Sequence, residues 1–123
     1  MISSKERDKN IIAQILEYCN HIDECFLQFG NNYKKYLSNV VFRDALSMPL
    51  FQIQELSLHL SDEFKEKYKN EIPWQKLRGM RNLFAHDYFN MDIETIWKTA
   101  TKDIPILRKF CEEQFKAFEK TDD

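Results

Sequence analysis

The sequence is poor in the residues that make sharp turns. Its 123 residues contain two glycines and three prolines. A sheet protein needs Gly- or Asn-rich turns at short intervals between its strands. The scarcity of such turns therefore predicts an all-α protein. A chain of this length fits one domain with its own core, so we expect a single helical domain over residues 1–123.

Cysteines and long apolar runs are scarce as well. The cysteines Cys19, Cys25 and Cys111 are odd in number and have no Cys-x-x-Cys spacing, which predicts reduced thiols in a cytosol. No run approaches the ~18 apolar residues that a membrane span requires, and the first residues lack the apolar region of a signal peptide. We therefore expect a soluble, cytoplasmic protein with no membrane partner.

The chain also lacks an excess of positive charge. Its formal net charge is -2 and its pI is about 5.9, unlike a basic nucleic-acid-binding domain. Six lysines and arginines between residues 65 and 81 form a local excess, but Glu63, Glu66 and Glu71 are interleaved with them. A solvated face of mixed charge is the favoured interpretation of the lysines, and any contact with RNA must be local.

Apolar residues at three- and four-residue steps predict a first helix and a second one. Ser3 or Ser4 is expected to cap the first helix and Gly30 to end it, with residues 33–38 as a short connection. The second helix is expected from about Val40 to Tyr68. Pro49 lies inside it and predicts a kink or a break, or a helix that starts near Met48.

Two more helices complete the expected architecture. Pro73 is placed as the first residue of a third helix that runs from Trp74 to about Tyr88. Asp92 is expected to cap a fourth helix, in which Pro105 predicts a second kink. The chain is thus expected to form a compact up-and-down bundle of about four main helices.

The third helix carries the segment Arg81-Asn-Leu-Phe-Ala-His86-Asp-Tyr88. Arginine matches a pair of phosphate oxygens, and histidine titrates near neutral pH. On a straight helix Asn82 and His86 share a face, whereas His86 lies about 140° from Arg81. Phosphodiester cleavage without a metal needs a base, an acid and a cation, and one copy supplies one histidine. A two-fold dimer would supply two, so we expect a site shared between two chains.

Less specific readings compete with this one. A single histidine near a helix end is more often a cap or a packed side chain than a catalyst. His21 and Cys25 have a spacing that could hold a metal, but no further ligand accompanies them and core packing is favoured. Trp74 and Trp97 could stack on bases, yet both fit a core or dimer-interface pattern.

Three segments carry a family resemblance. They are Glu71 to Thr99 with the following Asp103-Ile-Pro, Ile53-Gln-Glu55-Leu, and Leu60-Ser-Asp-Glu-Phe-Lys. Together they strongly resemble the HepT-like family of HEPN-domain proteins. The resemblance implies a small all-helical homodimer and a toxin ribonuclease of a toxin–antitoxin pair, with the signature Arg-x-x-x-x-His-x-Tyr.

The resemblance also assigns roles to residues. It implies that Arg81 and His86 carry metal-independent RNA cleavage without a cofactor, and that Asn82 positions groups in the same site. Tyr88 would accept AMP from an MntA-type nucleotidyltransferase antitoxin. Glu55 would support the site by orienting Arg81 or His86, or else form a salt bridge. The alternative function is a non-catalytic nucleotide- or substrate-binding subunit of a nucleotidyltransferase complex.

Overall fold

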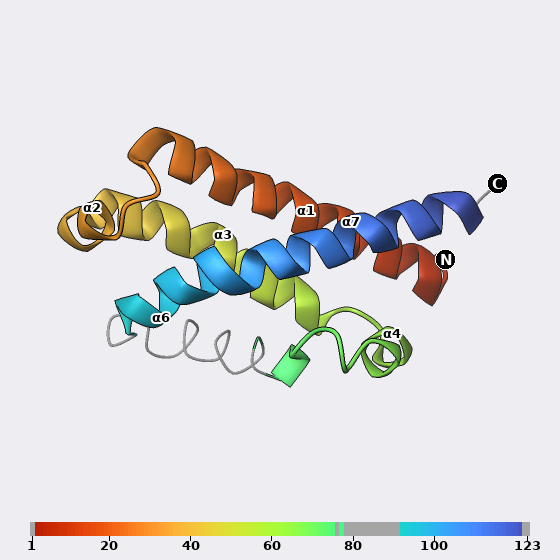
Figure 1. Cartoon of the computed structure of the whole chain (residues 1–123). Helices are drawn as coiled ribbons and strands as arrows, with labels where there is room; N and C mark the ends of the chain where they lie inside the picture. The colour runs from red at the N-terminus through yellow and green to blue at the C-terminus, as the bar shows by residue number, and fades with distance from the viewer. Residues whose placement is uncertain (1, 76, 78–91, 122–123) are drawn as a thin grey trace.

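The protein is an assembly of helices, as its computed structural model shows (Figure 1). The structure describes residues 2–75, 77 and 92–121, and every regular element within them is helical. The long helices are α1 (Ser4–Phe29) and α3 (Val40–Leu58), which pack side by side, and α7 (Ile104–Thr121). The shorter elements are α2 (Tyr33–Ser38), α4 (Asp62–Lys67), α6 (Ile93–Lys98) and the π-helical turn η2 (Thr99–Asp103). The expected all-α bundle is confirmed.

Local capping sets the ends of α1 as expected. The Glu6 amide donates a hydrogen bond of 3.1 Å to the Ser3 hydroxyl, which satisfies a free donor of the first turn. At the other end, Gly30 has a φ of 89° and its amide donates to the Phe26 carbonyl at 2.8 Å. The helix thus ends at a residue with a positive φ, which glycine adopts without a steric penalty.

The expected connection at residues 33–38 is wrong, because these residues form the helix α2. Asn32 caps it by accepting a hydrogen bond of 3.0 Å from the Lys35 amide. Tyr36 is fully buried, and its hydroxyl donates to the Ile93 carbonyl at 2.7 Å. Burial of one aromatic side chain and a contact distant in sequence therefore stabilise a helix that is too short to form alone.

The expected second helix is correct at its start and wrong at its end. The Asn39 side chain accepts hydrogen bonds from the Val41 and Phe42 amides, so α3 begins at Val40 as expected, and not at the alternative start near Met48. It continues through Pro49 without a break, since the proline removes a single hydrogen bond of the helix. The helix ends at Leu58, and Ser61 caps a separate α4 by accepting from the Phe64 amide.

The fourth predicted helix is present with an irregular turn. The Glu94 amide donates to the Asp92 side chain at 2.9 Å, which confirms the expected cap of α6. The helix continues through η2, where the Ile104 amide donates to the Thr99 carbonyl five residues earlier. This wider turn ends at Asp103, two residues before Pro105. The expected irregularity at that proline therefore takes the form of a π-helical turn, which accommodates a residue without an amide hydrogen.

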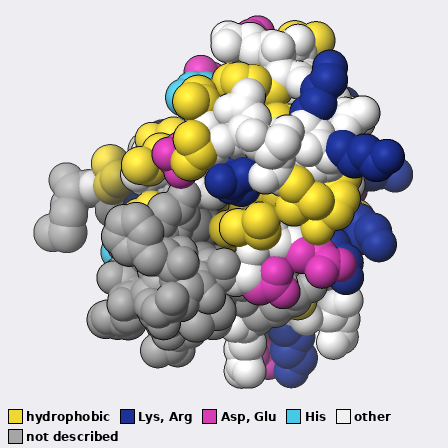
Figure 2. Space-filling view, turned by 90° about the vertical axis from the view of Figure 1, so that its left-hand side faces the viewer, with side chains coloured by type: hydrophobic (Ala, Val, Ile, Leu, Met, Phe, Trp, Pro, Cys, Tyr) yellow, Lys and Arg dark blue, Asp and Glu magenta, His cyan; other side chains and the backbone are white. Residues whose placement is uncertain are grey.

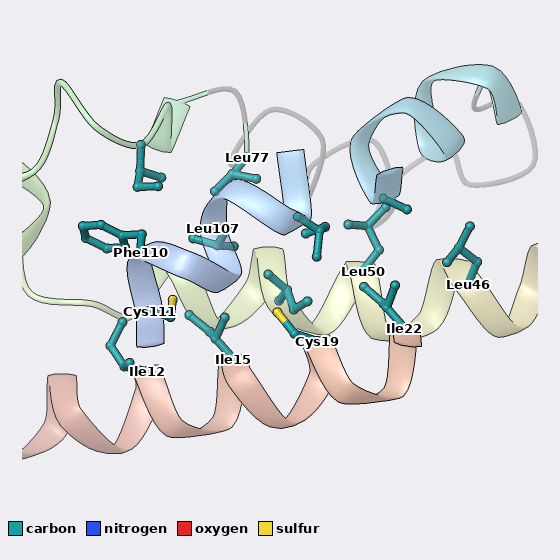
Figure 3. Close-up of a cluster of buried hydrophobic side chains, with 14 of the residues drawn as sticks. Ile12, Ile15, Cys19, Ile22, Leu46, Leu50, Leu77, Leu107, Phe110 and Cys111 are labelled. Atoms are coloured by element: carbon teal, nitrogen blue, oxygen red, sulfur yellow. The ribbon is translucent and has the colours of Figure 1, made fainter. Parts of the chain in front are cut away.

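The core lies where α1, α3 and α7 meet (Figure 3). Ile22 of α1 lies beside Leu50 of α3, whereas Ile12 lies farther along α1 beside Cys111 of α7. Leu107, Phe110 and Cys111 of α7 close the cluster from the other side, and all these side chains are buried. None of the helices within the described residues is long and apolar enough to cross a membrane.

Candidate functional site

The four motif residues lie outside the described part of the chain. Arg81, Asn82, His86 and Tyr88 belong to residues 78–91, so the roles predicted for them stay predictions. The structure does place both flanks of this segment, together with Glu55. The flanks are Trp74, Gln75 and Leu77 on one side and Asp92 with Ile93 on the other.

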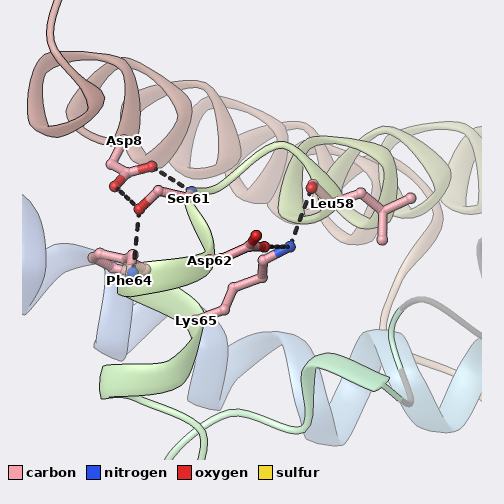
Figure 4. Close-up of polar contacts among 6 residues, drawn as sticks. All are labelled: Asp8, Leu58, Ser61, Asp62, Phe64 and Lys65. Carbon is pink, nitrogen blue, oxygen red and sulfur yellow. Dashed lines mark hydrogen bonds and ion pairs between the residues drawn. The ribbon is translucent and has the colours of Figure 1, made fainter.

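The first flank packs against α4 through Trp74 and Phe64, and α4 is in turn tied to α1. Asp8 of α1 is 4% exposed, and its two carboxylate oxygens accept hydrogen bonds from the Ser61 amide at 2.8 Å and the Ser61 hydroxyl at 2.6 Å (Figure 4). The same Ser61 oxygen accepts from the Phe64 amide at 3.1 Å. Hydrogen bonds to an ionised group are stronger than neutral ones. The start of α4 is therefore fixed to α1.

Trp74 begins the helical turn that leads into the motif segment. The Leu77 amide donates to the Pro73 carbonyl at 3.2 Å, so Pro73 directly precedes the first helical residue instead of being that residue. The Trp74 ring lies against Phe64 and Phe110, with centroid distances of 6.4 and 6.1 Å. The core interpretation of Trp74 is confirmed. Beyond Leu77 the predicted third helix lies outside the described residues.

A hollow adjoins this turn. It has a volume of about 400 Å³ and is lined by Ser57, Leu58, Lys65, Trp74 and Gln75. The Lys65 ammonium group donates to the Leu58 carbonyl at 3.3 Å and lies 3.7 Å from the Asp62 carboxylate. These contacts hold the lysine against the protein, which fits the mixed-charge face expected for this region.

The second flank is tied to α2. Ile93, the first residue of α6, receives the hydrogen bond from the Tyr36 hydroxyl. Trp97, one turn later, packs against Tyr36 at 4.9 Å and Phe26 at 5.7 Å between ring centroids. Trp97 is therefore a core-packing residue, as expected. The residues that follow the motif segment are thus held in place by a hydrogen bond and by packed aromatic rings.

Glu55 lies on α3, one turn before the helix ends. Its carboxylate is 3.7 Å from His59 Nε2, and the two side chains are 31% and 65% exposed. Such a partly exposed pair contributes little to stability. The salt-bridge alternative for Glu55 thus has a partner on the same helix, and its predicted support of Arg81 or His86 stays a prediction.

Gln54, next to Glu55, is a polar residue that sequence reasoning missed. Its side chain is fully buried, and neither amide atom has a hydrogen-bond partner among the described residues. A buried amide without a partner destabilises a protein by about 1–3 kcal/mol. The available signal was a glutamine next to Ile53 on the apolar side of α3. Gln54 therefore places two polar atoms on the buried face of α3.

The thiols and the remaining histidine offer no alternative site. Burial raises the pKa of Cys19 and of Cys25 to about 11, so neither thiol is an effective nucleophile near neutral pH. His21 is exposed and lies 3.8 Å from Glu17, while Cys25 packs in the core. Within the described ranges, no group of three His, Cys, Asp or Glu side chains could hold a metal ion.

The chain is similar in sequence to known proteins of one family. The family model described as "Ribonuclease HepT-like" matches residues 15–114. Putative RNase MJ1380 of Methanocaldococcus jannaschii is 32% identical over 106 residues, which cover 86% of this chain and 94% of the relative. Putative RNase MJ1216 of the same organism is 32% identical over 94% of this chain and 93% of its own length.

A relative from another archaeon agrees with these. Probable ribonuclease HepT of Thermococcus cleftensis is 30% identical over 85% of this chain and 92% of its own length. No solved structure matches the chain significantly. The matches extend over most of this chain and of each relative, and they confirm the family resemblance of the motif segments. This chain belongs to the HepT-like family of ribonucleases.

Proposed function

We propose that this protein is the ribonuclease toxin of a toxin–antitoxin pair and cleaves RNA without a metal ion. The observation that carries the proposal is the complete Arg81-x-x-x-x-His86-x-Tyr88 signature in a chain that the family model covers from residue 15 to 114. The relatives with this coverage are named as ribonucleases. The motif residues have the chemistry that the reaction requires.

The proposed reaction needs groups from two copies of the chain. One neutral His86 imidazole takes the proton of the attacking hydroxyl while its oxygen bonds to phosphorus. The protonated His86 of the second copy gives a proton to the leaving oxygen as its bond to phosphorus breaks. Arg81 stabilises the negative charge that develops on the phosphate oxygens. Asn82 positions the imidazole, and Glu55 supports Arg81 or His86.

Tyr88 is the proposed control point. Its phenol oxygen would attack the α-phosphorus of ATP on an MntA-type nucleotidyltransferase, with pyrophosphate as the leaving group. The resulting adenylate is bulky and anionic, and it would occupy the phosphate-binding cleft and pair with Arg81. Mass spectrometry of the protein co-produced with the enzyme from the neighbouring gene should show one AMP on Tyr88. An unmodified Tyr88 in a neutralised complex would refute this route.

RNA cleavage in EDTA tests the catalytic proposal directly. The wild-type protein should cut RNA and stop growth on induction, and Arg81→Ala and His86→Ala should abolish both effects while remaining folded by circular dichroism. Full activity in either folded variant would remove that residue from the mechanism. A wild-type protein that leaves RNA intact but binds nucleotide or the transferase would instead be the non-catalytic subunit.

A further inference from the structure

The end of the molecule formed by α2 and the start of α3 concentrates positive charge. Between Glu24 and Asp44 the sequence contains Lys34, Lys35 and Arg43 and no acidic residue, although the whole chain has a net charge of -2. Both lysines are exposed, and neither forms an ion pair with another described residue. On the adjoining α6, by contrast, Lys98 is 3.2 Å from Glu94. The two lysines of α2 thus keep their charge available to a polyanion.

An aromatic ring is exposed beside these lysines. Tyr33 is 36% exposed, and its ring lies parallel to that of Tyr36 within 24° at a centroid distance of 6.1 Å. Trp97 supports the same ring at 5.5 Å. Because Tyr36 is buried and Trp97 packs against the core, the Tyr33 ring rests on side chains that are themselves held in place. Figure 2 views this end and shows Lys and Arg side chains beside hydrophobic ones.

This surface lies within reach of the proposed catalytic residues. The Tyr36 hydroxyl is bonded to the carbonyl of Ile93, which is seven residues after His86. Seven residues span at most about 25 Å even when fully extended. Whatever path the intervening chain takes, a strand of RNA that passes His86 therefore needs only a short extension to reach α2.

We propose that α2 binds single-stranded RNA on one side of the cleaved bond, with a base stacked on Tyr33 and phosphates on Lys34 and Lys35. This inference rests on the proposed ribonuclease function and adds a substrate-binding surface to it. An aromatic platform next to unpaired cations is the combination that binds single strands without sequence preference. The Arg43 guanidinium contributes positive charge, while it donates hydrogen bonds to the Tyr36 and Leu37 carbonyls at 3.2 and 2.6 Å.

Equilibrium binding tests the proposal separately from cleavage. The probe is a fluorescein-labelled single-stranded RNA of about a dozen nucleotides, within the site sizes of such surfaces. It is titrated into the full-length His86→Ala protein, so that it stays intact. Lys34→Glu/Lys35→Glu should weaken binding at least about tenfold and lower the slope of log affinity against log salt by about 1.4.

Two matched comparisons isolate the effect. Lys116→Glu/Lys120→Glu changes the net charge equally on α7, near the chain ends and opposite α2, and should leave affinity within about twofold. Tyr33→Ala should weaken binding at least about fivefold, whereas Tyr33→Phe keeps the ring and should retain it. Equal losses in both charge variants would overturn the proposal, because they would reflect net charge alone.

The outcomes separate this inference from the function on which it rests. If wild-type protein cuts RNA while the α2 variants bind the probe and show KM values like the wild type, the surface is wrong and the ribonuclease stands. If wild-type protein cuts no RNA but the α2 variants lose the probe selectively, the binding surface stands without the cleavage. Light scattering completes the test, because loss of a dimer in the α2 variants would assign the surface to contact between copies and overturn the proposal.

Discussion

Asp8 and Ser61, 53 residues apart in sequence, meet through two hydrogen bonds between α1 and the start of α4. We expect Asp8→Ala to lower the free energy of unfolding by about 2–3 kcal/mol, because it leaves the Ser61 amide and hydroxyl without their charged acceptor. Urea denaturation measures the change. Glu24→Ala, at an exposed position of α1, is the comparison. A loss below 0.5 kcal/mol, the scatter of ordinary surface changes, would show that this contact does not anchor α4.

The buried amide of Gln54 predicts an unusual response to an apolar substitution. Gln54→Met keeps the length of the side chain and removes two polar atoms that have no partner among the described residues. The free energy of unfolding should therefore stay the same or rise by up to about 2 kcal/mol. Thermal and urea denaturation give the value, with Gln52→Met on the more exposed side of α3 as the comparison. A clear loss of stability would mean that the amide is hydrogen-bonded in the protein.

Buried thiols predict a fall in stability at alkaline pH. Burial raises the pKa of Cys19 and Cys25 from about 9.0 to about 11, so the native protein keeps protons that the unfolded chain releases. The resulting stability is fully present below pH 9 and is lost as the pH rises from 9 to about 11. Urea denaturation across this range should show the loss, and Cys19→Ala/Cys25→Ala should reduce its steepness. An identical profile in that variant would contradict the assignment to these thiols.

The hydrogen bond between Tyr36 and Ile93 predicts a link between α2 and catalysis. Tyr36→Phe removes only the hydroxyl that holds the first residue of α6, so stability should fall by about 1 kcal/mol. The chain that follows the motif would lose a fixed point, and kcat for RNA cleavage should fall more than KM rises. Tyr18→Phe on α1 serves as the control. Unchanged kcat in folded Tyr36→Phe would limit this bond to a structural role.

The proposed site shared between two chains predicts how inactive copies affect active ones. Equal amounts of wild-type and His86→Ala chains, mixed by co-production, should give roughly one quarter of the wild-type activity per dimer, because only wild-type pairs contain two imidazoles. Independent sites would instead give one half. Ribonuclease assays on the purified mixture, with its composition measured by mass spectrometry, distinguish the two values. One half would refute the shared site.

Short-range signals in the sequence were sufficient for part of this fold. Ser3, Gly30, Asn39 and Asp92 act within a few residues of their own positions, so the four helix ends that they set were predicted correctly, although Asn39 was not named as a cap. The helix α2 could not be predicted, because its stability depends on a contact between Tyr36 and Ile93. The break after Leu58 was hidden because apolar residues continue at helical spacing across it.

The candidate site, too, could be predicted from the sequence only in part. The type and spacing of Arg81, His86 and Tyr88 were enough to indicate the family, which the comparisons confirm. Sequence periodicity could not reveal the fixed support under Tyr33, since it is built from rings on α2 and α6. Gln54 carried a weak signal in its place next to Ile53, but only the folded structure shows that its side chain is fully buried.

At the turn after α1, the choice of residue at position 30 is restricted by the backbone torsion angle and not by lack of space. A Cβ atom added to Gly30 would have a single neighbour within 4 Å, the Lys35 ammonium nitrogen at 3.9 Å. The φ of 89° alone therefore disfavours every L-residue at this position. A positive φ is the ordinary sign for a D-residue, so a D-alanine introduced by chemical synthesis would not meet this restriction on φ. The bend that leads from α1 into the proposed RNA-binding helix would accept a mirror-image residue more readily than a natural one.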